Sequence, residues 1–276
     1  ERENRVLVPV LADEAHTESL LDVALLLRGD SSETPLYALS VARRSGDDEP
    51  PVDLADARLD HVQEYTSEGN VPLRPLTMIA FDRTDAIVRA VAENQIRTLV
   101  VPWESGRTVG EVVFGRSIRR LLARTKIRVV LTRVRDPLNA VDRLHVYLPG
   151  RVIQHRGCLD GLSLVKQLAA RLDVPLRATV IDGDVERYTR VMDAVGPDHP
   201  FEVDSTASYL SVGRDPDETE ALALRVVLRP RPDARGWTSE IETVTTRIGA
   251  SDSGVAMAVY LPESGPIGSS KPFRIE

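Results

Sequence analysis

The sequence predicts an α/β protein made of two tandem, doubly wound, mostly parallel five-stranded sheets, the second of them degenerate. Short apolar segments alternate with amphipathic segments along the whole chain, a pattern typical of parallel strands covered by helices on both faces. The same order of elements starts again after residue 142. A repeat on the scale of a domain favours two α/β domains over one, and 276 residues with 42% hydrophobic content can bury two cores.

The first repeat alternates apolar runs, which predict strands, with segments whose apolar residues recur every three or four positions, which predict helices. Leu20, Leu21 and Ala24 form one such helical face, and Ile87 and Val91 lie on another. In chain order we expect strand 5–10, helix 14–28, strand 35–41, helix 54–67, strand 72–80, helix 85–95, strand 97–102, helix 110–124 and strand 127–134.

The second repeat follows the same rules, and Leu162, Val165 and Leu168 mark the inner face of its first helix. Its third helix is shortened, because Gly213 and Pro216 both break helices. In chain order we expect strand 143–148, helix 159–172, strand 174–181, helix 184–195, strand 201–207, helix 209–220, strand 223–229, helix 238–248 and strand 254–261.

The punctuation between these elements predicts the domain boundaries. Domain 1 spans 1–136, a polar linker spans 137–142, and domain 2 spans 143–262. The segment 263–276 is rich in Gly, Ser and Pro and is expected to be a loosely ordered tail. We expect the two domains to pack about a pseudo-two-fold axis through their last strands.

Charge and composition exclude several classes of function. A net charge of −7 without a basic, aromatic-rich cluster argues against nucleic acid as a partner. The single cysteine, Cys158, excludes an internal disulfide or a cysteine zinc cluster and indicates a reducing, cytosolic compartment. No apolar run approaches the roughly 20 residues that cross a bilayer. No metal site is expected, because the histidines are scattered: His16, His61, His145, His155 and His199.

The segment from Val100 to Leu122 is a candidate phosphate cradle. An apolar strand runs into a glycine-bearing loop and then into an amphipathic helix. Such a junction gathers free backbone N–H groups at the positive end of a helix dipole, where many proteins hold phosphate. The candidate anion-binding residues in it are Gly106, Arg107, Thr108, Gly115, Arg116 and Ser117.

The opening strand Arg5-Val-Leu-Val-Pro-Val10 and the glycine loop after the fourth strand resemble the universal stress protein fold, which is adenine nucleotide α-hydrolase-like. The chain also resembles, over essentially its whole length, the cytosolic C-terminal region of Kef-type and Na+/H+ cation/proton antiporters. That second resemblance rests on the motifs Phe114-Gly-Arg-Ser-Ile-Arg-Arg-Leu-Leu122, Pro137-Leu-Asn-Ala-Val-Asp-Arg143 and Leu162-Ser-Leu-Val-Lys-Gln-Leu-Ala169.

The resemblance implies a regulatory module on the cytoplasmic side of the cell membrane. It implies an N-terminal transmembrane transporter domain as the partner in the full-length protein, and a homodimer. Because the sequence begins with Glu1 and has no apolar signal core, we expect it to be a piece of a longer protein. The alternatives are a free-standing soluble nucleotide-binding universal stress protein and a dimerisation platform without a ligand.

The nucleotide motif implied by the resemblance, G-x2-G-x9-G-[S/T], is degenerate here. Trp103 stands at the first glycine position, and only eight residues separate Gly106 from Gly115. The adenine-contacting aspartate after the first strand is replaced by Leu11, next to Val10, and leucine cannot accept a hydrogen bond. We therefore expect no cofactor. ATP, AMP or another anion in domain 1 is the alternative, as against an inherited turn whose glycines only permit positive φ.

The second copy of this loop, residues 229–238, contains two prolines and one glycine, and we expect no nucleotide there. The two tryptophans, Trp103 and Trp237, could stack on a base or simply pack. Cys158 near His155 could form a reactive thiolate or pack against the sheet. The arginine row of one helix could contact an acidic partner or be a solvated face: Arg116, Arg119, Arg120 and Arg124. No catalytic constellation is recognisable, so no enzyme is expected.

Overall fold

The computed structural model describes residues 4–10, 14–28, 34–44, 50–103, 115–212, 222–251 and 253–263, and of residues 115–117 only the backbone. The first half of the chain carries β1 (Val6–Pro9), α1 (Glu14–Arg28), β2 (Leu36–Arg43), α2 (Val52–Glu68), β3 (Leu73–Ala80), α3 (Arg83–Glu93), β4 (Thr98–Pro102), α4 (Gly115–Arg124) and β5 (Arg128–Val134). A short 3-10 helix, η1 (Leu138–Ala140), lies within the predicted linker.

The second half repeats this order. It carries β6 (Arg143–Pro149), the 3-10 helix η2 (Val152–Gln154), α5 (Cys158–Leu172), β7 (Leu176–Ile181), α6 (Val185–Ala194), β8 (Phe201–Thr206), β9 (Ala223–Arg229), α8 (Glu240–Gly249) and β10 (Val255–Tyr260). Of the shortened helix predicted at 209–220, residues 209–212 form a turn, and the rest lies outside the described residues. Of the predicted tail at 263–276, only Glu263 is described, and its N–H donates to Lys126 O at 3.1 Å; the rest lies outside the described residues.

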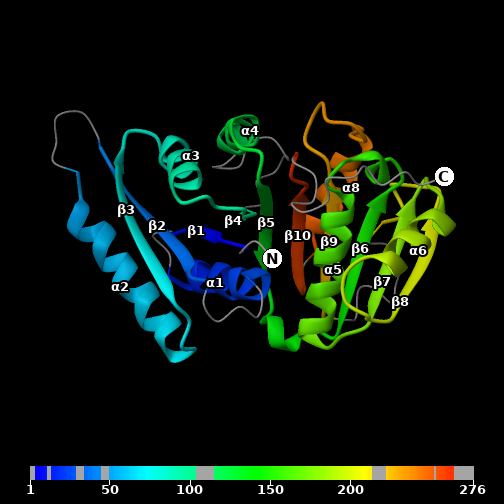
Figure 1. Cartoon of the computed structure of the whole chain (residues 1–276), viewed down its shortest axis with the longest axis horizontal. Coiled ribbons are helices and arrows are strands. Elements are labelled where there is room, and N and C mark those ends of the chain that lie inside the picture. The colour runs from blue at the N-terminus through cyan, green and yellow to red at the C-terminus, as the bar shows by residue number, and fades with distance from the viewer. Residues whose placement is uncertain are drawn as a thin grey trace.

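The predicted α/β class with parallel five-stranded units is confirmed, but the two units form one sheet. Ten strands run in the order β3-β2-β1-β4-β5-β10-β9-β6-β7-β8. Neighbours are parallel within each half, and β5 pairs with β10 antiparallel, with Val130 opposite Val259. The predicted contact between the last strands is therefore a continuous hydrogen-bonded ladder. Figure 1 shows β5 and β10 side by side between the two halves. The domain boundaries stay a prediction.

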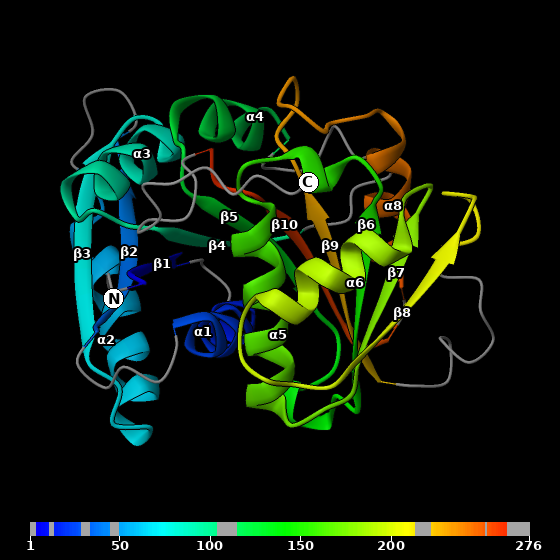
Figure 2. The same cartoon turned by 45° about the vertical axis from the view of Figure 1, so that its right-hand side comes forward.

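Helices cover both faces of the sheet, with equivalent helices of the two halves on the same face. One core contains Leu21 of α1, Val62 of α2, Leu168 of α5 and Met192 of α6. The other contains residues of α3, α4 and α8, such as Ile87, Leu121 and Val244. This arrangement fits a pseudo-two-fold axis perpendicular to the sheet. Figure 2 shows α1 next to α5, and there Arg171 Nη1 donates to Leu26 O at 2.7 Å.

Proline blunts one free edge of this sheet. The amides of Leu36 and Arg44 donate to Pro72 O and Ala80 O, so even-numbered residues of β3 point their backbone groups at β2. Pro75 is odd-numbered, so its nitrogen, which carries no hydrogen, faces the open edge of the sheet. A proline at this position removes no hydrogen bond between β3 and β2. The outer edge of β3 therefore offers one hydrogen-bond donor fewer to another strand.

Candidate functional site

The predicted site lies where the strand order reverses between β1 and β4, which is where open parallel sheets bind ligands. Val10 is buried there, and its N–H donates to Leu39 O at 2.8 Å. Leu11, Gly106, Arg107 and Thr108 lie outside the described residues. Gly115, Arg116 and Ser117 form the first turn of α4, and only their backbone is described. Anion binding at this point stays a prediction.

Trp103 follows β4 and packs between the two halves. Its backbone N–H donates to Thr132 O at 2.7 Å. Its ring lies against Gly249, the last residue of α8, where an added Cβ would be 2.5 Å from Trp103 Cζ2. Arg133 Nη1 donates to Gly249 O at the same place. The sequence left two alternatives for the Trp103 ring, stacking on a base or packing against protein. In the structure the ring packs against Gly249. The helix end in the second half needs glycine because the indole leaves no room for a side chain.

Two arginines of the α4 row bind acidic residues of the same chain. Arg120 Nη1 lies 2.7 Å from Asp82 Oδ2 and Arg120 Nη2 lies 3.3 Å from Asp85 Oδ1, while Arg124 also pairs with Asp85. Asp82 is the N-cap of α3, and its hydrogen bond from Arg120 holds the pKa of its carboxyl below the usual range. Arg120 and Arg124 therefore tie α4 to the start of α3 and are not simply a solvated face.

In the second half, the equivalent point between β6 and β9 is filled by main chain. The N–H of Gly150, at the end of β6, donates to Ile181 O at 2.7 Å, as that of Val10 does to Leu39 O. An added Cβ on Gly150 would lie 2.1 Å from Asp182 O. Gly236 has φ +89°, and its Cβ would lie 2.5 Å from Arg151 O. The loop after β9 therefore rests directly on the chain that leaves β6.

Arg229, the last residue of β9, and Arg231 of the loop are buried, whereas Arg235 is exposed. Arg229 is 1% exposed, pairs with Glu242, and lies 4.4 Å from the centre of the Tyr260 ring. Arg231 is 2% exposed and donates to Leu122 O and Ile127 O, at the end of α4 in the other half. Burial lowers the pKa of Arg231. The sequence predicts this loop only as a degenerate cradle, and that prediction missed the buried arginines.

In each half, the segment after the fourth strand thus contacts the fourth helix of the other half. Trp103 lies against the end of α8, and Arg231 lies against the end of α4. The carbonyls that end a helix carry partial negative charge, so a guanidinium there is favourable. These reciprocal contacts join the two halves in addition to the β5–β10 ladder.

Cys158 packs and is not a reactive thiolate. Although it begins α5, its side chain is 2% exposed and burial raises the pKa of its thiol to about 12. His155 Nδ1 accepts a hydrogen bond from Gly157 N at 3.0 Å, and burial lowers the pKa of its imidazole. A thiolate needs a depressed pKa to be reactive near neutral pH. The packing alternative is therefore what the structure shows.

The described residues form neither a metal site nor a membrane span. Within these ranges, no three His, Cys, Asp or Glu side chains gather where they could hold a metal ion. None of the helices among the described residues combines the length and the apolar character that a membrane span requires.

Comparison with known proteins rests on structure, since no protein-family model and no curated protein sequence matches the chain. It superposes on the cytoplasmic domain of a prokaryotic cation chloride cotransporter with a TM-score of 0.67 and 12% identity, covering 95% of this chain and 96% of that one. It superposes on a universal stress protein from Archaeoglobus fulgidus with a TM-score of 0.62 and 13% identity, covering 95% and 98%.

The chain has the universal stress protein fold. A third structure agrees, a putative universal stress protein from Pseudomonas aeruginosa with a TM-score of 0.64, 13% identity and coverage of 95% and 94%. In each case nearly the whole chain is matched, so both halves belong to the shared fold. The strand order 3-2-1-4-5 of the first half is repeated in the second.

Proposed function

We propose that this chain is a non-catalytic cytoplasmic regulatory module of a membrane cation transporter, of the cation/proton antiporter type, and that it acts as a homodimer. The observation that carries the proposal is the match of nearly the entire chain to the cytoplasmic domain of a cation chloride cotransporter. The antiporter motifs in the sequence support the same kind of attachment. Both halves together form the unit that is matched.

The joined halves suit such a module. The β5–β10 ladder, Trp103 on Gly249 and Arg231 on the end of α4 connect the two halves through one sheet. Regulation requires that a ligand or ionic condition favour one conformational state of the module over another. A change at the α4 end of one half would reach the other half through these contacts.

Fractionation of the source cells tests the attachment. Antibodies raised against the 276-residue chain should detect a polypeptide in the membrane fraction that is far larger than 30.4 kDa, because a transporter domain adds many apolar spans. Crosslinking of that fraction should give a band at twice the polypeptide's mass. A band of about 30.4 kDa in the supernatant alone would overturn the proposal.

The second candidate function is a free-standing universal stress protein that binds a nucleotide. The match of 95% of this chain to 98% of the Archaeoglobus fulgidus universal stress protein favours it. Leu11 at the adenine-contacting position and the one-residue-short glycine spacing count against it.

Thermal denaturation with ligands separates the candidates. A ligand that binds the folded state raises the melting temperature. If the chain is the regulatory module, we expect ATP and AMP to change the melting temperature of the unliganded chain by less than about 1 °C. A simple anion such as phosphate should raise it by roughly 2 °C or more at saturating concentration. A larger rise with ATP than with phosphate would favour the free-standing stress protein. No shift with any ligand would favour a dimerisation platform without a ligand.

A further inference from the structure

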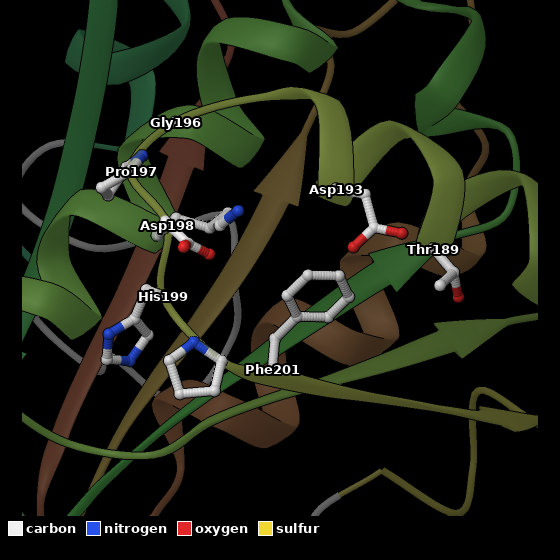
Figure 3. Close-up of a pocket in the computed structure, with 9 residues that line it drawn as sticks. Thr189, Asp193, Gly196, Pro197, Asp198, His199 and Phe201 are labelled. Carbon is white, nitrogen blue, oxygen red and sulfur yellow. The ribbon is translucent and has the colours of Figure 1, made fainter.

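One pocket lies far from the points where the strand order reverses. It measures about 520 Å³ and lies between α5, the end of α6 and the start of β8 (Figure 3). Phe201, which lines it, is the first residue of β8, and His199 Nε2 lies 2.9 Å from Val174 O, just before β7. The pocket is therefore at the amino ends of the strands, whereas parallel sheets bind nucleotides at the carboxyl ends.

A buried lysine lines this pocket. Lys166 of α5 is 3% exposed, and its ammonium donates to Met192 O at 3.0 Å and lies 5.3 Å from the centre of the Phe201 ring. An ammonium has three donors, and lysine is almost never buried unless it is paired with a negative charge. Among the described residues, no carboxylate lies within the 4.0 Å of an ion pair with it.

The wall beside Lys166 is formed in advance of any ligand. Gly196 has φ +72°, and its Cβ would lie 3.2 Å from Lys166 Cβ, so the chain after α6 packs closely on α5. Pro197 and Pro200 restrict the backbone of the same segment. His199 donates its Nε2 proton to Val174 O, which orients the ring. A preformed wall lowers the entropy cost of binding.

The mouth of the pocket is acidic. Asp193 and Asp198 both line it, and both are exposed, unlike Lys166. Figure 3 shows them on opposite sides of the Phe201 ring. The pocket thus carries a positive charge at its buried end and two negative charges at its open end.

We propose that this pocket binds a small zwitterion of the α-amino-acid type, with its carboxylate at the Lys166 ammonium and its own ammonium near Asp193 and Asp198. The carboxylate supplies the counter-charge that the buried lysine lacks, and charge-assisted hydrogen bonds are the stronger ones. Phosphates and nucleotides are disfavoured, because their multiple negative charges would meet the two aspartates. The site goes beyond the proposed transporter attachment and does not depend on it.

Thermal denaturation of the 276-residue chain with neutral amino acids, acetate and inorganic phosphate tests the site. The variants are Lys166→Met, Asp193→Asn and, as the matched control, Lys126→Met at an exposed lysine. A neutral amino acid at about a hundred times its Kd should raise the melting temperature by roughly 5 °C. The shift should disappear in Lys166→Met, need about tenfold more ligand in Asp193→Asn and persist in Lys126→Met.

The unliganded Lys166→Met variant should melt at the same temperature as the parent or higher, because an apolar residue of similar volume often replaces a buried charge without loss. Met192 O also keeps a hydrogen bond, from Val195 N. Its failure to respond would then reflect the missing ammonium and not unfolding. If no amino acid raises the melting temperature, the pocket holds only water and the proposal is wrong. It is also wrong if Lys166→Met still responds to amino acids, or if acetate or phosphate gives a shift as large as that of the amino acids and Lys166→Met abolishes that shift too.

Discussion

Replacing Gly150 by alanine is expected to lower the free energy of unfolding by about 3 kcal/mol or more. The new methyl group would lie 2.1 Å from Asp182 O and 2.7 Å from the Cα of Gly183. Both are backbone atoms, and the chain cannot move apart there without breaking the hydrogen bond from Gly150 N to Ile181 O. Urea denaturation followed by circular dichroism measures the change.

Gly69→Ala is the matched control for this prediction. Gly69 ends α2 with φ −87°, and the nearest atom to an added Cβ is Val71 Cγ2 at 3.5 Å, an ordinary contact. The control should change the free energy of unfolding by less than about 1 kcal/mol. Equal effects of the two substitutions would show that Gly150 does not lie as close to Asp182 O as the 2.1 Å for an added Cβ implies. The prediction would then fail.

Replacing Arg231 by methionine is expected to lower the free energy of unfolding by about 2–4 kcal/mol. The substitution leaves Leu122 O, which is buried, and Ile127 O, which is partly buried, without their donor. An unsatisfied buried carbonyl costs the full penalty of losing water. Because Arg231 belongs to one half and both acceptors to the other, hydrogen exchange of the amides in α4 should also become faster.

Arg235→Met is the matched control, because Arg235 lies in the same loop and is exposed. It should change the free energy of unfolding by less than about 0.5 kcal/mol. The rate of hydrogen exchange of the amides in α4 should stay the same. A stability loss in Arg231→Met with unaltered exchange in α4 would mean that the residue stabilises only its own half. The reciprocal contact between the halves would then have to be abandoned as the means of coupling.

The regular elements could be predicted from the sequence because their signals are local. The helix predicted at 14–28 and the strand predicted at 223–229 have these same bounds in the structure. The helix predicted from residue 85 begins at Arg83, because Asp82 caps it by accepting from the amides of Thr84 and Asp85. The tandem repeat was also visible, since each copy has its own periodicity.

The candidate site was less predictable. The altered glycine spacing and Leu11 are features of the sequence, and they define the cradle as degenerate without any structure. What Trp103 contacts could not be predicted, because its neighbour Gly249 is far away in the chain and belongs to the other half. Lys166 was not among the residues predicted for the inner face of its helix. The sequence carried no signal of a pocket there, since that pocket is completed by residues 189–201.

The sequence by itself determined the fold class, the order of the elements, the repeat and the loss of the nucleotide motif. These depend on periodicity, turn residues and spacing, which act over a few residues. Only the tertiary structure decided that the two sheets are one, that Trp103 and Arg231 each contact the opposite half, and that Lys166 lies buried beside a pocket. The physical reason is that a side chain's partners are set by surfaces that meet only when distant segments pack, and no local pattern encodes that meeting.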